Sequence, residues 1–325
     1  MIIQCYGYVY LILDMKIICA IPIRRIDSLF LKAIDSLFNL DYEDIEYLLY
    51  FDNVEIRNNE SIKNWILFEN LLLHNSRWVA GRVTLVNSLV RNGLIKSWNE
   101  SSRLSSKIFE NSDLFFWAND HDLWHKEFLS YPIEIFTKMD DISLVVPQYG
   151  ILKSGHVTRL NQKNKEIKNS ISSTIDHAGY SIYGVFKIGE FPKLPNTLLP
   201  DRLLICLFLA ERKIMKENSS QIKFIRIYES SQKFSIKRQK RNLWPSEKKR
   251  FYNGLLPWWL SHIIQISCVY FYNRVLRQKK SYSFTWYTAV IWSTLRKTKL
   301  RKRIFKKYLK LKRQAIVLFQ RITNF

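Results

Sequence analysis

A strand-helix-strand pattern near the start of the chain narrows the possible folds more than any other segment. The apolar run from Lys16 to Ile21 predicts a short buried strand, which ends at Pro22. The next segment, "IDSLFLKAIDSLF", has apolar residues at helical spacing behind a capping candidate, Asp27 or Ser28. The segment "IEYLLYFDN" is a second apolar run that reaches Asp52. This order favours an α/β fold with a mostly parallel central sheet and helices on its faces.

Further patterns of both kinds follow along the chain. Apolar residues at helical spacing predict helices within 60–76, 81–110, 124–138 and 199–215, with a turn at Asn92-Gly93. Strand-like runs lie at 113–120, 142–149, 180–188 and 220–230, and a polar loop spans 153–175. At 325 residues and 47% hydrophobic composition, the chain is able to bury a large core.

Two carboxylates follow the apolar run in "FFWANDHDLW". Residues i and i+2 of an extended segment point to the same side, so Asp120 and Asp122 are expected to face one cation. Hard cations such as Mg²⁺ and Mn²⁺ choose carboxylate oxygens and often complete their shell with substrate phosphates. Because ligands bind at the carboxyl ends of parallel strands, we expect Asp52 in the same crevice. From these residues alone, a solvated turn with His121 as a spacer is the alternative.

Several short motifs occur together in a familiar order. The segments are "MKIICAIPI", "YFDN", "NGLIKSWNE", "FFWANDHDLW", "IYGVFK", "LPDRLL" and "FSIKRQKRNLW". Their order and rough spacing resemble family 2 glycosyltransferases of the GT-A fold, in a bacterial subgroup with an Asp-His-Asp form of the DxD motif. The resemblance covers residues 15–250. It implies a Rossmann-like sheet, a nucleotide-sugar donor and a Mn²⁺ or Mg²⁺ cofactor.

The resemblance also implies roles for single residues near the strand ends. Asp52 matches the aspartate that contacts the nucleotide of the donor, and Pro22 matches the proline in the loop of the first strand. Asp120 and Asp122 match the motif for the metal and the diphosphate, with Asp122 as the direct ligand. The three aspartates are thus expected to converge on one cation and diphosphate pocket.

The residue expected to act on the acceptor departs from the usual motif of the family. Asp201 matches the acidic position that, in inverting members, accepts the acceptor's proton, but the family usually has an acidic pair where this chain has Pro200-Asp201-Arg202. A carboxylate near the start of a helix is also favoured by the helix dipole, so both roles stay open for Asp201.

Three more residues are possible substrate contacts, each with a structural alternative. Arg202 is a candidate for holding phosphate or a solvated helix charge, and Trp124 for stacking on a sugar or packing in the core. Gly184 interrupts a strand pattern, where glycine permits close approach of backbone or ligand or marks a bulge.

The net charge of +23 is concentrated at the end of the chain. The last 78 residues hold 19 Lys or Arg and no Asp or Glu, which leaves +4 for the first 247. Residues 251–325 alternate basic clusters with apolar residues, a pattern that predicts an amphipathic helical tail on an anionic membrane surface. Nucleic acid is the competing partner, but no nucleic-acid-binding motif accompanies the tail.

Two features bear on the compartment. The four cysteines show no paired spacing and no CxxC, which favours a reducing cytosol over a disulfide framework or a zinc site. Residues 1–14 have no basic start and no small-residue cleavage site, so secretion is not expected. They are an extra strand or an upstream translation artefact.

The resemblance implies an inverting, metal-dependent glycosyltransferase, and the basic tail predicts a position at the cytoplasmic face of the cell membrane. The implied acceptor is a saccharide or a lipid-linked sugar in surface polysaccharide or glycolipid synthesis. The alternative is a non-catalytic protein, membrane-associated or nucleic-acid-binding, on a degenerate GT-A scaffold.

Overall fold

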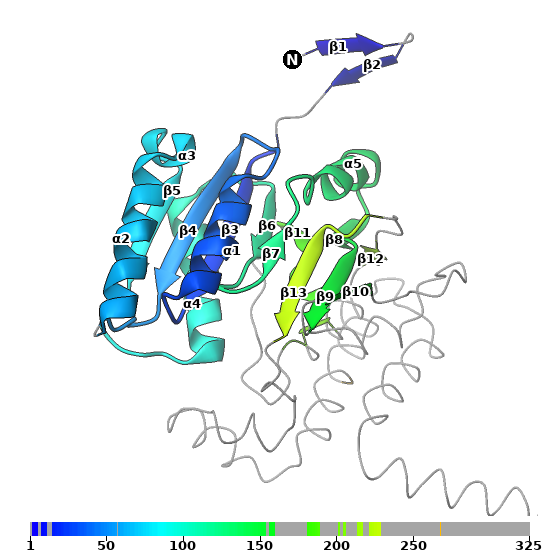
Figure 1. Cartoon of the computed structure of the whole chain (residues 1–325). Helices are drawn as coiled ribbons and strands as arrows, with labels where there is room; N and C mark the ends of the chain where they lie inside the picture. Colours follow the sequence, from blue (N-terminus) through cyan, green and yellow to red (C-terminus); the bar gives the residue numbers. More distant parts are fainter. Residues whose placement is uncertain are drawn as a thin grey trace, which may run out of the picture.

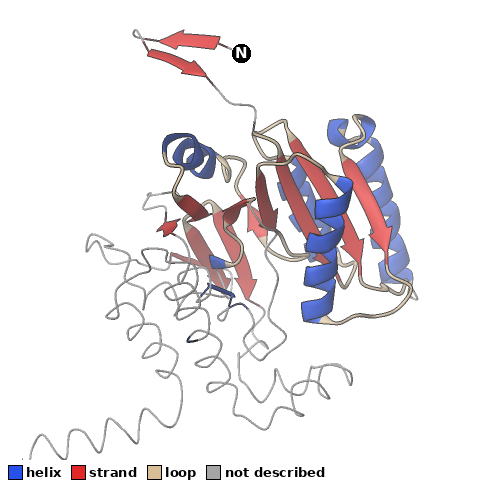
Figure 2. Cartoon of the chain, turned by 180° about the vertical axis from the view of Figure 1, so that it is seen from behind, coloured by secondary structure: helices blue, strands red, loops and turns tan. Residues whose placement is uncertain are grey.

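The computed structural model describes the body of the chain and selected later segments. These are residues 2–5, 8–11, 15–56, 58–153, 156–159, 181–188, 201, 204–205, 213–216, 221–228 and 267. They form a central sheet with helices on both faces and a smaller sheet beside it (Figures 1 and 2). The predicted tail, 251–325, lies outside the described residues except for Ser267.

The central sheet has seven strands and is mostly parallel, as predicted. Across the sheet they are β12 (Lys213–Lys216), β8 (Ile142–Val146), β11 (Val185–Lys187), β6 (Leu114–Trp117), β3 (Ile17–Ile23), β4 (Ile45–Phe51) and β5 (Val83–Asn87). Only β11 runs antiparallel to its neighbours, β6 and β8. Every residue of β3 is buried, because β3 lies in the interior of a sheet that is covered on both faces.

Five helices accompany the strands in the described part of the chain. They are α1 (Ser28–Phe38), α2 (Asn59–Leu73), α3 (Ser76–Val79), α4 (Leu94–Ile108) and α5 (Ser130–Lys138). Asp27 caps α1 as expected, since its Oδ1 accepts the backbone N–H groups of Leu29 at 3.0 Å and Phe30 at 2.9 Å. Helices α1 and α2 pack on one face of the sheet and α4 on the other (Figure 2).

A second, four-stranded sheet adjoins the central one. Its order is β10 (His156–Arg159), β9 (Tyr149–Lys153), β13 (Phe224–Tyr228) and β7 (Leu123–Trp124). Strand β7 directly follows the Asp120–Asp122 segment and pairs with β13 through Trp124 and Phe224, whose rings lie 5.2 Å apart. The pairing therefore attaches a late strand of the chain to the candidate site. At the amino end, β1 (Ile2–Cys5) and β2 (Tyr8–Leu11) form an antiparallel hairpin.

Aromatic packing holds β6 in place. Trp117 is fully buried, and its ring lies 5.3 Å from that of Trp98 on α4 and 5.9 Å from that of Phe186 on β11. Its indole N–H donates to the carbonyl of Trp98 at 3.3 Å. Burial of a large aromatic side chain contributes on the order of 2 to 3 kcal/mol. The end of β6, where the two predicted ligands begin, is thus a rigid platform.

Five secondary-structure predictions are wrong in part. The predicted polar loop 153–175 contains strand β10 at His156–Arg159. Residues 83–87 form β5 inside the predicted helix 81–110, because Val83, Thr84 and Val86 are β-branched and pair with β4. Lys213–Lys216 are strand β12 and not the end of a helix, since they pair with β8. The predicted helix 124–138 begins only at Ser130, because Trp124 belongs to β7, and the predicted strand 180–188 begins only at Val185.

No helix in the described ranges combines the length and the apolar character needed to cross a lipid bilayer.

Candidate functional site

The carboxyl end of β3 lies between two of the predicted acidic residues. The N–H of Asp52, after β4, donates to the carbonyl of Ile23 at 2.9 Å. The N–H of the next residue, Arg24, donates to Oδ2 of Asp120, after β6, at 2.9 Å. Strands β4, β3 and β6 are parallel neighbours in the central sheet (Figure 1). Their carboxyl ends thus bring Asp52, Arg24 and Asp120 to one edge of the sheet, the edge at which such sheets bind ligands.

Asp52 is 1% exposed, and its carboxylate is occupied by the start of α4. Oδ1 accepts the N–H of Asn92 at 2.6 Å, and Oδ2 accepts the N–H of Gly93 at 3.1 Å and the hydroxyl of Ser97 at 3.2 Å. Gly93 is the N-cap residue of α4 and has no side chain that could accept a hydrogen bond. The carboxylate of Asp52, which follows β4, caps the helix in its place. The Asn92-Gly93 turn was predicted, and φ of +83° at Gly93 shows why glycine stands there.

The surroundings of Asp52 form a closed polar network. Nδ2 of Asn92 donates to the Tyr50 hydroxyl at 2.7 Å and to the Ser88 hydroxyl at 2.9 Å. Asn53 has φ of +49°, a left-handed conformation that asparagine tolerates and that turns the chain after β4. The network satisfies the buried polar groups with the chain's own partners, which gives Asp52 a structural role whatever it binds.

Asp120 and Asp122 lie on a turn and not on an extended segment, which corrects the expected geometry. Oδ1 of Asn119 accepts the N–H groups of His121 at 3.1 Å and Asp122 at 2.8 Å, and this side-chain bonding folds the chain back on itself. The two carboxylates consequently have different partners. Asp120 bonds to Arg24 and His121, and Asp122 to Asn119 and the N–H of Ile227.

Asp120 and His121 form a coupled pair. Nδ1 of His121 lies 2.8 Å from Oδ1 of Asp120. Burial opposes ionisation of Asp120, but the hydrogen bond and charge of His121 and the N–H of Arg24 outweigh it, so the pKa of Asp120 lies below its ordinary value. Burial by itself lowers the pKa of His121, but the carboxylates of Asp120 and Asp122 raise it above the ordinary value. His121 is thus a partner of Asp120 and more than a spacer.

Asp122 is fully buried and is the least compensated carboxylate of the turn. Burial raises the pKa of Asp122, against the opposing charges of His121 and Arg226 and the hydrogen bonds from Asn119 and Ile227. The N–H of Ile227 donates to its Oδ1 at 2.8 Å, so β13 closes over the turn. A carboxylate whose ionised form is disfavoured by burial gains from an additional positive charge.

Tyr183 and Arg226 complete the surroundings of the turn. The guanidinium of Arg226 lies over the Tyr183 ring, 5.7 Å from its centroid. Burial raises the pKa of Tyr183 to about 12, the charges of Asp122 and Asp201 act in the same direction, and a hydrogen bond with Asn119 opposes them. These interactions place Asp201 within electrostatic range of the same cluster.

The other predicted residues have packing roles in the structure. Pro22 is buried in β3. The pairing of β3 with β6 ends at Ala20, so the missing N–H of Pro22 removes no hydrogen bond to β6. Trp124 is 4% exposed and packs in the smaller sheet. At Gly184 an added Cβ would lie 2.6 Å from the Val145 carbonyl oxygen, so glycine permits close contact with β8. Arg202 lies outside the described residues.

The donor chemistry of the turn fits a hard divalent cation in part. Mg²⁺ is usually held by one or two carboxylates together with substrate phosphates, and Asp122 and Asp120 are of the right type. Among the residues that the structure describes, no group of three or more His, Cys, Asp or Glu side chains is arranged to hold a metal. A cation here would need ligands from the substrate.

Four residues of the site were not identified from the sequence. Asn119 shapes the turn, Asn92 joins Asp52 to α4, Arg24 binds Asp120 through its backbone N–H, and Arg226 brings positive charge to Asp122. Arg24 could have been identified from the sequence, because it directly follows the end of a predicted strand. Nothing in the local pattern marked Arg226, which reaches the turn only through the pairing of β13.

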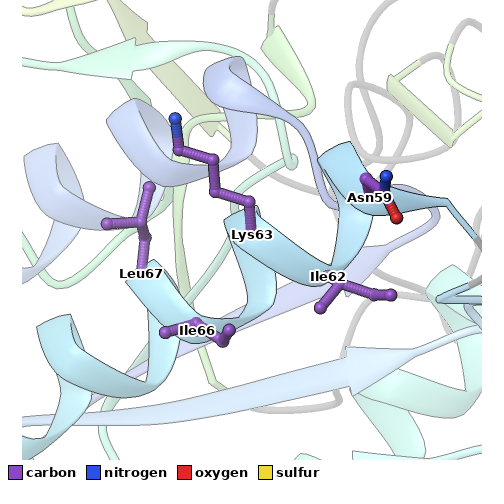
Figure 3. Close-up of a pocket in the computed structure, with 5 residues that line it drawn as sticks. All are labelled: Asn59, Ile62, Lys63, Ile66 and Leu67. Atoms are coloured by element: carbon purple, nitrogen blue, oxygen red, sulfur yellow. The ribbon is translucent and has the colours of Figure 1, made fainter.

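A separate shallow hollow lies on the outer side of α2 (Figure 3). It is lined by Asn59, Ile62, Lys63, Ile66 and Leu67. The lining is mostly aliphatic, comes from a single helix and includes no carboxylate. It therefore offers none of the chemistry expected of a site for a nucleotide sugar and a metal.

Comparison with known proteins defines the fold. No protein-family model matches the sequence, and no match was found among curated proteins. The structure is similar to that of S. aureus TarS 1-349 in complex with UDP-GlcNAc, over 82% of this chain and 74% of that one, with 14% identity and a TM-score of 0.51. The mannosyltransferase PcManGT from Pyrobaculum calidifontis, in complex with GDP-Man and Mn²⁺, matches 87% of this chain and 86% of that one, with 11% identity and a TM-score of 0.46.

The likeness to TarS, together with the strand order, confirms the predicted fold class. The chain is an α/β protein with a GT-A type, Rossmann-like sheet. At 14% identity the likeness concerns the fold and not the residues of the site.

Proposed function

We propose that the protein is an inverting, metal-dependent glycosyltransferase that moves a sugar from a nucleotide donor to a hydroxyl of a saccharide or lipid-linked acceptor. The observation that carries this proposal is the position of Asp120 and Asp122 on a buried turn at the carboxyl end of β6. That edge is where sheets of this kind bind ligands. The similarity of the fold to the UDP-GlcNAc complex of TarS supports a nucleotide sugar as the ligand.

The proposed donor site uses the three strand ends. Asp122, with Asp120, would hold a Mn²⁺ or Mg²⁺ ion, which neutralises charge on the departing diphosphate when it is bound. Asp52 and Pro22 would border the nucleotide, with Asp52 also holding the start of α4. His121 keeps Asp120 ionised through their hydrogen bond, and an ionised carboxylate is the form that binds a cation.

Asp201 is the proposed general base for the acceptor hydroxyl. Its charge acts on Tyr183, which is hydrogen-bonded with Asn119 of the turn, so Asp201 belongs to the same electrostatic cluster as Asp122. A positioned carboxylate base contributes on the order of 10² to 10⁴ in rate. Arg202 is proposed as an additional contact to phosphate. The proposal does not extend to Trp124 or Gly184, since packing accounts for both residues.

Thermal unfolding of the full chain tests the donor site. A nucleotide sugar with Mn²⁺ should raise Tm, because a ligand that binds only the folded state stabilises it. Asp122→Asn should abolish the rise, since the amide keeps the shape but loses the charge that holds the cation. The matched control is Asp41→Asn, which affects an exposed carboxylate paired with Lys126 at 3.4 Å and should leave the rise intact.

A non-catalytic protein on the same scaffold is the second candidate, and one observation favours it. Each carboxylate oxygen of Asp52, Asp120 and Asp122 already accepts a hydrogen bond within the chain. If no UDP, GDP, dTDP or CMP sugar changes Tm with Mn²⁺ present, the enzyme proposal fails and this candidate stands.

We also propose that residues 251–325 attach the protein to the inner face of the cell membrane. The proposal is supported by the composition of this segment, which contains 16 Lys or Arg and no Asp or Glu. Each cation near an anionic leaflet contributes about 1 kcal/mol. Flotation with vesicles of anionic lipid should recover the full chain, and a chain that ends at residue 250 should stay in the soluble fraction. Equal recovery of both chains would refute the proposal, and binding of the full chain to duplex DNA or RNA in place of vesicles would favour nucleic acid.

A further inference from the structure

Arg24 occupies the centre of the proposed donor edge. Its backbone N–H holds Asp120, and the carbonyl of the preceding residue, Ile23, holds the N–H of Asp52, both at 2.9 Å. The side chain therefore starts between the two strand ends that the proposed function assigns to the nucleotide and the metal. No other side chain of the site begins at the end of β3, the strand that lies between β4 and β6.

The Nε of Arg24 is buried and has no hydrogen-bond partner among the residues that the structure describes. In the described part of the chain Arg24 forms no ion pair, whereas the adjacent Arg25 is paired with Asp27 at 3.0 Å. Asp120 is bonded by the backbone of Arg24 and not by its guanidinium, and charge from Arg25 helps to keep the pKa of Asp120 low. Arg24 is thus a permanent cation with a buried, unused donor.

An unused buried donor calls for an acceptor from outside the chain. Leaving such an N–H without a partner is unfavourable, and an arginine cannot escape the cost by losing its proton. The planar, charged fork of arginine suits phosphate oxygens, which it binds with two parallel hydrogen bonds. An anionic group that enters between Asp52 and Asp120 would meet this requirement.

We infer that Arg24 binds the diphosphate of the nucleotide donor, an inference that rests on the proposed function. The sequence supports a special role, because two consecutive arginines follow directly after a fully buried strand. Arg25 is engaged by Asp27 at the start of α1, and Arg24 supplies the charge for the ligand. Arg24 is then a donor-binding residue that separates nucleoside diphosphates from nucleosides.

The test compares UDP, GDP and their nucleosides on the full chain with Mn²⁺ present, by calorimetric titration for the nucleotides and competition for the nucleosides. Arg24→Gln should weaken binding of the preferred nucleoside diphosphate by about 10- to 100-fold, the usual effect of losing a charged hydrogen bond. Affinity for the nucleoside should change by less than about 2-fold. Arg24→Lys should recover part of the loss, since it restores the charge without the fork.

Two controls separate binding from folding. Arg82→Gln removes a half-buried arginine paired with Asp44 at the opposite end of β4 and should leave nucleotide affinity unchanged. The Tm of Arg24→Gln without ligand should equal or exceed that of the wild type, because the substitution removes an unsatisfied donor. If Arg24→Gln does not fold, Arg24 has a structural role and the inference is wrong. In that case Arg24→Lys provides independent evidence, because it should then retain full affinity for UDP or GDP.

The outcomes also separate this inference from the proposed function. If the wild type binds UDP or GDP and Arg24→Gln binds equally well, only the inference fails. If Arg24→Gln weakened binding of the diphosphate and of the nucleoside equally, Arg24 would contact the base or the ribose, and the inference would be wrong. If the wild type binds no nucleotide, the proposed function fails and the inference fails with it.

Discussion

The carboxylate of Asp52 accepts the backbone N–H of Asn92 at 2.6 Å and so joins the end of β4 to the start of α4. The two residues are 40 positions apart, and the bond is completed by Gly93 and Ser97 on the same carboxylate. A residue proposed as a contact for the nucleotide is thereby also a capping group for a helix. The candidate site and the stability of the fold are coupled at this point.

Asp52→Ala should lower the free energy of unfolding by about 1 to 3 kcal/mol, because it leaves buried N–H groups at the start of α4 without an acceptor. Asp52→Asn keeps one acceptor oxygen and should cost less. Urea unfolding of the full chain measures both. Asp44→Ala is the control, since its partly solvent-accessible pair with Arg82 should contribute about 1 kcal/mol. Unchanged stability of Asp52→Ala together with lost nucleotide binding would show a role in ligand binding alone.

Gly184→Ala should destabilise the protein by about 1 to 3 kcal/mol, the usual cost of overpacking. The new Cβ would lie 2.6 Å from the Val145 carbonyl oxygen, and backbone cannot move aside as a side chain does. Gly150→Ala is the matched comparison, because its Cβ would meet the Ile222 Cδ1 at 2.9 Å, the movable end of a side chain. Thermal unfolding of both variants decides the question, and equal costs would contradict the packing account of Gly184.

Tyr183 should make stability depend on pH in the alkaline range. Burial raises its pKa from 10.0 to about 12, so the folded state favours the protonated phenol. The stabilisation is complete below pH 10 and is lost as pH rises from 10 to about 12. Tyr183→Phe should flatten the curve of unfolding free energy against pH in that window, by up to about 3 kcal/mol relative to wild type, as measured by urea unfolding. Parallel curves for the two proteins would show that Tyr183 does not titrate as a buried group.

Asp201→Asn should lower kcat by about 10² to 10⁴ with little change in donor affinity, if Asp201 is the general base. The amide keeps the size of the side chain and loses the ability to accept a proton. Initial rates of sugar transfer, with donor affinity measured separately, distinguish this role from one at the start of a helix. A loss of thermal stability with unchanged kcat would assign Asp201 to the helix alone.

Local pattern was sufficient for the first half of the central sheet. The predicted order of strand, helix and strand corresponds to β3, α1 and β4, because a run that is buried on both sides of a sheet must be continuously apolar. Asp27 was identified as the cap of α1 for an equally local reason, since a cap bonds to N–H groups two and three residues away. The strand ends at Asp52 and Asp120 followed from the same runs.

The sequence pattern predicted the wrong secondary structure where the apolar residues of one segment fitted both a helix and a strand. Strand β5 lies inside a segment expected to be helical, and its apolar residues fit either structure until it pairs with β4. Lys213–Lys216 became a strand for the same reason, through pairing with β8. Edge positions of a sheet are decided by the partner that is present, which a single segment does not reveal.

The sequence by itself determined the α/β class, the parallel sheet and the positions of Asp52, Asp120 and Asp122 at strand ends, because these depend on residues close together in the chain. Only the tertiary structure decided what each carboxylate touches. The Asn119 turn separates the partners of Asp120 and Asp122, β13 brings Arg226 and the N–H of Ile227 to Asp122 from 105 residues away, and Asp52 holds the start of a helix 40 residues on. Hydrogen bonds and burial between distant segments are cooperative products of the whole fold, so no local pattern carries them.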